Sequence, residues 1–127
     1  DGEVLFTDEA FKKNLEKLIT QSRQFTQNIS FIGLTPADDA LLNPIPWAPD
    51  KAYKNERVKY FESILADKCK KEELPFLPLN EVWQKRSDWK DQLIDGVHPN
   101  SKGHALLAEQ IGEFLLTETF YTFHIAS

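Results

Sequence analysis

The sequence Asp95-Gly96-Val97-His98-Pro99-Asn100 places an acid and a histidine three residues apart, directly before a segment with helical periodicity. A histidine that acts as a general base needs an exposed ring nitrogen and a second group that fixes its tautomer through the other nitrogen. The Asp95 carboxylate can supply that group if the chain turns back at Gly96, because glycine tolerates unusual dihedral angles. Pro99 biases His98 toward an extended backbone and stops a helix from running back through the turn. The pattern therefore predicts a turn that holds an Asp95–His98 pair.

An Asp-x-x-His turn also occurs for purely structural reasons, but the longer run from Asp95 to His104 is more specific. It resembles the last motif block of the SGNH, or GDSL-type, esterase and lipase family, in which a DxxHP run opens the final helix. The resemblance implies a flavodoxin-like α/β fold, a three-layer α/β/α sandwich with a parallel sheet. It also implies a serine hydrolase acting on small-molecule carboxylic esters without a cofactor, with Asp95 as the orienting acid and His98 as the general base of its triad.

The other motifs of that family do not occur in the 127 residues. The family's nucleophile lies in a Gly-Asp-Ser motif, and an oxyanion-hole asparagine lies in a Gly-x-Asn-Asp motif. Residues 1–4 look like the segment that follows the Gly-x-Asn-Asp block. The resemblance thus implies that residues 1–127 are the C-terminal portion of a single hydrolase domain. The expected partner of the incomplete chain is then a missing N-terminal segment that carries the serine, or a second copy of the chain in a homo-oligomer.

Two rival interpretations remain open at this point. The chain can be a non-catalytic fragment or a half-domain that depends on a partner, or it can be a small-ligand binding module that uses the loop around Trp47.

The composition is that of an ordinary globular protein, with 41% hydrophobic and 28% charged residues. The length suggests one domain at most. The net charge of −5 argues against a nucleic-acid partner, whose binding surface would be basic. The sequence holds no run of 18 apolar residues, so no membrane span is expected. The single cysteine, Cys69, is expected to be a small core residue, and it favours a soluble, cytoplasmic protein.

Hydrophobic periodicity predicts an alternation of helices and strands. We expect helices over 8–25, 54–72 and 101–119, strands over 29–34 and 75–79, a helical or irregular segment over 80–94 and an edge strand over 120–125. The expected apolar faces of the three helices are Phe11, Leu15, Leu18, Ile19 and Ser22; Val58, Phe61, Leu65 and Cys69; and Leu107, Ala108, Ile111, Phe114 and Leu115. The expected N-caps of these helices are Thr7, Asn55 and either Asn100 or Ser101, and Gly103 is expected to allow close packing under the turn. The alternation of helices and strands is typical of an α/β/α sandwich, but two strands are too few to cover three such helices.

A long proline-rich loop over 35–53 follows the first expected strand. Ligands of parallel sheets bind beyond the carboxyl ends of the strands, so this loop is expected to border the site. The large apolar residues of the loop either line an acyl pocket or cover the core: Leu41, Leu42, Ile45 and Trp47. The predicted substrate-binding residues are Thr35, Pro36, Trp47 and Val97.

Two groups of residues raise the question of a metal site. Asp38 and Asp39 are adjacent acids, but no further ligand pattern accompanies them, so we expect them to cap a helix or turn. Asp95, His98 and His104 do not have the spacing of a zinc site. No metal is therefore predicted.

Overall fold

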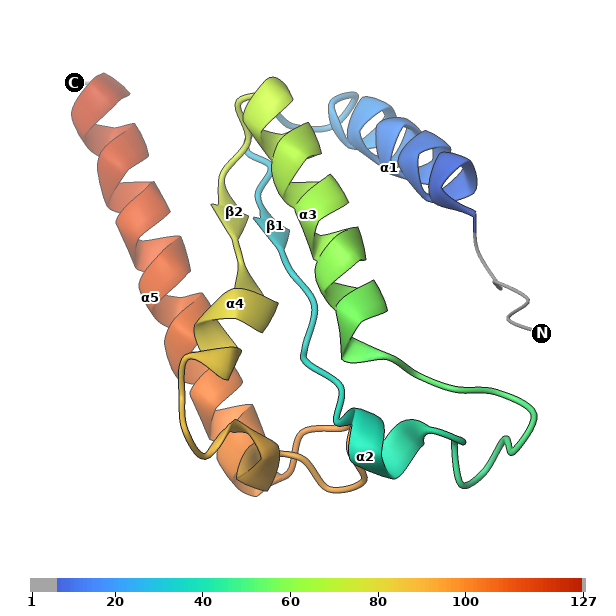
Figure 1. Cartoon of the computed structure of the whole chain (residues 1–127). Coiled ribbons are helices and arrows are strands. Elements are labelled where there is room, and N and C mark those ends of the chain that lie inside the picture. The colour runs from blue at the N-terminus through green and yellow to red at the C-terminus, as the bar shows by residue number, and fades with distance from the viewer. Residues whose placement is uncertain (1–6, 127) are drawn as a thin grey trace.

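The computed structural model describes the backbone of residues 7–126 and the side chains of residues 7–117 (Figure 1). The segment predicted to follow a Gly-x-Asn-Asp block, residues 1–4, lies outside this description. The helices are α1 (Asp8–Ser22), α2 (Asp39–Leu42), α3 (Asn55–Lys71), α4 (Leu79–Gln84), the 3-10 helix η1 (Trp89–Gln92) and α5 (Ser101–Ala126). Strands β1 (Phe31–Ile32) and β2 (Phe76–Leu77) form a parallel pair. The three predicted long helices and the two strands between them occur in the predicted order.

Helices cover both faces of the strand pair (Figure 1). Phe31 lies opposite Phe76, and both pack toward α1 and α3 against Leu15, Ile19 and Leu65. The next pair, Ile32 and Leu77, points to the other face because side chains alternate along a strand. On that face Leu77 packs in a cluster with Leu79, Trp83, Leu93 and Leu106. This is the layering of an α/β protein, although the sheet of the described residues has two strands and the full sandwich stays a prediction.

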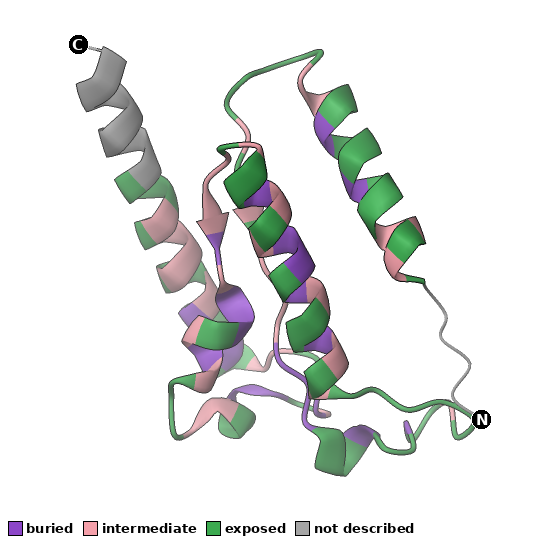
Figure 2. Ribbon diagram, turned by 45° about the horizontal axis from the view of Figure 1, so that its top comes forward, coloured by how far each residue is buried: buried purple, intermediate pink, exposed green. Residues whose placement is uncertain are grey.

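Helix α1 begins where its sequence predicts. The Thr7 side chain accepts a hydrogen bond from the Ala10 N–H at 3.1 Å, and acidic residues follow in the first turn, where the helix dipole favours them. Only Leu15 and Ile19 of the helix are buried, as a single stripe (Figure 2). Leu18 was expected on that stripe but is 52% exposed. The contact face of α1 is thus narrower than the apolar pattern suggested.

Helix α3 carries the predicted buried residues Val58, Leu65 and Cys69, while Phe61 is half-buried. Burial raises the pKa of the Cys69 thiol, as expected for a small core residue rather than a reactive one. The stripe also contains a charged residue, Glu62, which the apolar pattern did not include.

Helix α5 differs from its prediction at both ends. Its buried residues near the start are Gly103 and Leu106, whereas the expected Ala108 and Leu115 are exposed. The predicted edge strand over 120–125 is wrong, because the helix continues to Ala126. The segment contains no glycine or proline to end the helix, and extending an existing helix costs less than starting a strand.

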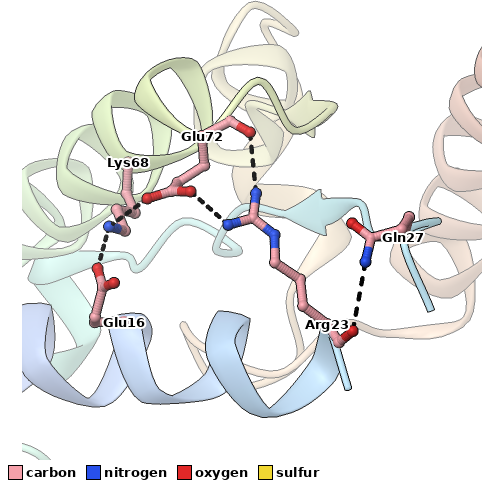
Figure 3. Close-up of polar contacts among 5 residues, drawn as sticks. All are labelled: Glu16, Arg23, Gln27, Lys68 and Glu72. Carbon is pink, nitrogen blue, oxygen red and sulfur yellow. Dashed lines mark hydrogen bonds and ion pairs between the residues drawn. The ribbon is translucent and has the colours of Figure 1, made fainter. Parts of the chain in front are cut away.

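A network of ion pairs joins α1 to the end of α3 (Figure 3). Glu72 accepts from Arg23 Nη1 at 2.6 Å and from Lys68 Nζ at 2.9 Å, and Lys68 also contacts Glu16. Arg23 Nη2 additionally donates to the Glu72 carbonyl oxygen at 3.2 Å. The hydrogen bonds from Lys68 and Arg23 lower the pKa of Glu72 from 4.5 to about 2. The network holds an otherwise exposed helix to the rest of the fold.

Candidate active site

The Asp95–His98 turn has the geometry that its sequence predicts. Asp95 Oδ2 lies 2.6 Å from His98 Nδ1. Asp95 Oδ1 accepts from two backbone N–H groups, those of Val97 at 3.0 Å and His98 at 2.8 Å. These contacts, led by the backbone N–H of His98, lower the pKa of Asp95 to about 2. The carboxylate is therefore ionised at neutral pH and lies against the imidazole of His98, whose side chain is 68% exposed.

Backbone hydrogen bonds close the turn on both sides. The Ile94 N–H donates to the His98 carbonyl at 2.8 Å, and Leu93 and Pro99 form an antiparallel bridge. Gly96 lies between them with φ +94°, a conformation that L side chains rarely adopt. A Cβ at Gly96 would also lie 3.1 Å from Cβ of Leu41. The positive φ therefore favours glycine at this position, and a Cβ there would in addition be tightly placed against Leu41.

Asn100 joins the turn to α5. Its Oδ1 accepts from the Gly103 N–H at 3.0 Å, so it caps the helix as predicted, and its Nδ2 donates to the Asp91 carbonyl at 2.7 Å. A Cβ at Gly103 would lie 2.3 Å from the Gln92 carbonyl oxygen, which confirms the predicted close packing under the turn. The start of α5 is therefore held directly against the segment that precedes the turn.

The loop after β1 brings Trp47 to His98. Its indole lies 6.3 Å from the imidazole between ring centroids, with the planes 39° apart. The Ala48 N–H donates to the Ile45 carbonyl at 3.0 Å, and these two residues form a bridge with Pro46 and Trp47 between them. The indole is 57% exposed. Trp47 and His98, fifty-one positions apart, thus share one surface.

The remaining predicted substrate-binding residues lie further into the fold. Pro36 is fully buried, Thr35 is half-buried, and Val97 packs on the core cluster. Leu42 and Ile45 belong to that cluster, so they cover the core and do not line a pocket, while Leu41 is 52% exposed. The cluster consists of Ala37, Leu42, Ile45 and Val58. A substrate contact by Thr35, Pro36 or Val97 stays a prediction.

Asp38 connects the Trp47 loop with the Asp95–His98 turn. Its side chain caps α2, with Oδ1 accepting from the Ala40 N–H, and its backbone N–H donates to the Gly96 carbonyl at 2.8 Å. Lys90 Nζ lies 2.9 Å from the same Oδ1. Asp39 accepts from the Asn55 N–H. The predicted capping role of both acids is confirmed, but the pairing with Lys90 left no signal in the sequence.

The buried carboxylate of Glu62 fixes the ends of both strands. Its Oε1 accepts from the Leu34 N–H at 3.0 Å and the Asn80 N–H at 2.8 Å, and its Oε2 accepts from the Glu81 N–H at 3.3 Å. A Cβ at Gly33 would lie 2.0 Å from Glu62 Oε1, so a glycine is needed there. The only sequence signal is that Glu62 stands on the apolar stripe of α3, four residues after Val58.

Asn55 extends this network toward the Trp47 loop. It was expected to cap α3, but the N-cap is Lys54, and Asn55 Oδ1 instead accepts from the Ala37 N–H at 3.0 Å and from Asn80 Nδ2 at 3.2 Å. Side-chain hydrogen bonds thus fix the backbone on both sides of Thr35 and Pro36.

Within residues 7–117, no three acidic, histidine or cysteine side chains are grouped so that they could hold a metal ion. No helix among the described residues combines the length and apolar character needed to cross a membrane.

Helices on both faces of parallel strands, with an Asp–His turn before α5, define an α/β protein with an Asp–His pair at the surface. Residues 1–106 match the family model described as the GDSL-like Lipase/Acylhydrolase family, and the chain belongs to that family. The family predicted from the DxxHP run is confirmed. An isoamyl acetate-hydrolyzing esterase of Saccharomyces cerevisiae is 30% identical over 69 residues, which are 53% of this chain and 28% of the yeast protein. The chain thus aligns with less than a third of that relative.

Proposed function

We propose that this chain supplies the Asp–His part of the catalytic triad of a serine hydrolase that acts on carboxylic esters. The observation that carries the proposal is the Asp95 carboxylate, which lies 2.6 Å from His98 Nδ1 while two backbone N–H groups hold its other oxygen. With Nδ1–H held by Asp95, the neutral imidazole presents Nε2 as its acceptor. The family membership and the yeast esterase support the same chemistry.

The proposed reaction runs through an acyl-enzyme. A serine hydroxyl attacks the ester carbonyl while His98 Nε2 takes its proton, and the Asp95 carboxylate stabilises the imidazolium. The C–O bond to the alcohol then breaks, and His98 returns the proton to the leaving oxygen. Water repeats both steps on the acyl-enzyme, with His98 as base and then as acid, and releases the carboxylic acid. No cofactor takes part.

The serine and the oxyanion-hole donors are proposed to come from sequence outside residues 1–127, because the 127 residues contain neither motif. The two-stranded sheet of the described residues supports this. Parallel strands are normally buried on both faces, whereas Ile32 of β1 is 39% exposed. If no such segment joins the chain, the alternative is a half-domain without hydrolase activity.

Replacing the base tests the proposal. In the protein expressed from the complete native reading frame, His98→Ala should lower kcat for p-nitrophenyl acetate by several orders of magnitude. His104→Ala is the matched control, because His104 is an exposed histidine one turn into α5. If His98→Ala retains more than about a tenth of the wild-type kcat, the triad assignment is wrong.

A further inference from the structure

Three large apolar side chains are exposed around the catalytic turn. Leu41 is 52% exposed, Trp47 57% and Ile94 71%. Ile94 directly precedes Asp95, Leu41 lies against Gly96, and the Trp47 indole lies beside the imidazole. Exposed apolar side chains gathered at one place mark a binding surface more often than scattered ones do. The surface lies next to the base and raises the question of which part of an ester it contacts.

The Trp47 loop is held in place although its tip is exposed. The Ile45 N–H donates to the Lys51 carbonyl at 2.9 Å, the Lys51 N–H donates to the Ala48 carbonyl at 2.9 Å, and the Tyr53 N–H donates to the Leu42 carbonyl at 2.9 Å. Pro46, the residue before Trp47, has a fixed φ. A side chain on such a loop loses little conformational entropy when it binds a ligand. Trp47 is therefore already placed for contact with a ligand.

The direction of proton transfer shows which half of an ester lies beside Trp47. Asp95 occupies Nδ1 of His98, so Nε2 must give the proton to the leaving alcohol oxygen. That oxygen has to come within about 3 Å of Nε2 for the transfer. The alkyl group bonded to the oxygen then lies next to the imidazole, within reach of an indole centred 6.3 Å away. The acyl group, in contrast, extends from the carbonyl carbon toward the serine and the oxyanion donors.

Resting on the proposed function, we propose that Trp47 is a specificity-determining residue that contacts the alcohol part of the ester and favours uncharged, apolar alcohols. The indole offers a large apolar face and no charge, and Leu41 and Ile94 extend the apolar surface around the turn. This assigns the loop to the leaving group, whereas its apolar residues were first considered as an acyl pocket.

Two ester series separate the two halves of the substrate. One keeps the acetyl group and lengthens the alcohol from methyl to hexyl, and the other keeps the methyl alcohol and lengthens the acyl chain. In the protein from the complete reading frame, kcat/KM should rise about two- to fourfold per methylene along the alcohol series, because full burial of one CH₂ corresponds to about fourfold. Trp47→Ala should flatten this rise and leave the acyl series unchanged, and Trp47→Phe should keep most of it.

Phe25→Ala is the matched control, because Phe25 is 88% exposed after the end of α1 and should change neither series. The proposal is overturned if Trp47→Ala leaves the alcohol dependence intact or flattens the acyl series equally. His98→Ala keeps this result separate from the proposed function. If His98→Ala remains active, the proposed function fails; if it is inactive while Trp47→Ala keeps the alcohol dependence, only the role of Trp47 fails.

A binding measurement on the protein from the complete reading frame makes the test independent of turnover. The indole N–H signals can be assigned by Trp→Phe substitution and followed by NMR during titration with 1-hexanol and, separately, with hexanoate. We expect the signals of Trp47 and the His98 ring to shift together with 1-hexanol and much less with hexanoate. Equal shifts with hexanoate, or no shift of Trp47 with 1-hexanol, would overturn the assignment.

Discussion

Replacing Asp95 by asparagine should separate the orienting role of this residue from its structural role. Asp95 Oδ1 accepts hydrogen bonds from two backbone N–H groups, and Oδ2 lies within hydrogen-bond distance of the imidazole Nδ1. An asparagine with its oxygen in the place of Oδ1 keeps both backbone hydrogen bonds. Its amide N–H₂ then faces His98 Nδ1 and donates to it, which places the ring proton on Nε2. The imidazole can no longer accept the serine proton.

The expected loss in kcat is on the order of 10⁴-fold, the magnitude of the same change in a serine protease, and corresponds to about 5 kcal/mol of transition-state stabilisation. The melting temperature should change little because the amide oxygen keeps both backbone hydrogen bonds and the amide N–H makes a new one to Nδ1. Asp95→Ala, in contrast, leaves both backbone N–H groups without their acceptor and should lower stability by ~1–3 kcal/mol as well as activity.

The assay combines ester hydrolysis by the protein from the complete reading frame with calorimetric melting and the ¹⁵N chemical shifts of the His98 ring. Asp91→Asn serves as the matched control, because Asp91 is an exposed acid in the same segment and only its carbonyl contacts Asn100. Wild-type kcat in Asp95→Asn, or an unchanged tautomer in the NMR spectrum, would refute the orienting role.

Three further changes test the surroundings of the site and the fold. Lys90→Met removes the ion-pair partner of the buried Asp38 carboxylate and should lower the free energy of unfolding, measured in urea, by ~1–3 kcal/mol. Lys85→Met, at an exposed ion pair, should change it by less than about 0.5 kcal/mol. Equal effects of the two substitutions would contradict the burial argument. Gly96→Ala should destabilise the protein by ~1–3 kcal/mol because the φ of Gly96 is +94°. Gly112→Ala, in helix α5 with open space around it, should stabilise the protein by up to about 1 kcal/mol. The opposite order of stabilities would refute the conformational role of Gly96. The pKa of Glu72 is lowered from 4.5 to about 2, so its contribution to stability is complete above about pH 4.5 and is lost as the pH falls toward 2. Glu72→Gln should flatten the pH dependence of the urea unfolding midpoint over that range. An unchanged pH dependence in Glu72→Gln would contradict this.

The structural features that could be predicted from the sequence are those set by the spacing of nearby residues. The Asp95–His98 pair, the Thr7 cap and the helical faces of α1 and α3 all arise from contacts within a few positions, so spacing alone identifies them. The first strand was predicted over 29–34 but spans Phe31–Ile32, because the limits of a strand depend on the length of its partner ladder. Local spacing contains no information about that partner.

Contacts between distant segments left weaker signals or none. Glu62 lies on the buried stripe of α3, where a charged residue breaks the apolar pattern. Its burial is explained only by the backbone N–H groups that donate to it, and these come from distant segments. Leu106 is buried in place of Ala108 because the close approach of Gly103 to Gln92 sets the face of α5 that meets the core. The proximity of Trp47 to His98 depends on how the loop folds back, which no spacing within the loop specifies.

The two parts of the candidate site depend on the fold to different degrees. The hydrogen bonds between Asp95 and His98 lie within four residues and persist as long as the turn itself persists. The position of Trp47 relative to that turn depends on Asp38, which bonds to the Gly96 carbonyl and to Lys90. Loosening Asp38 should therefore weaken the selection among alcohols before it weakens the chemistry. In Lys90→Met, a lower kcat/KM for acetate esters of long-chain alcohols, with unchanged hydrolysis of methyl acetate, would show this order of dependence. An equal loss of kcat/KM for the long-chain esters and for methyl acetate would contradict it.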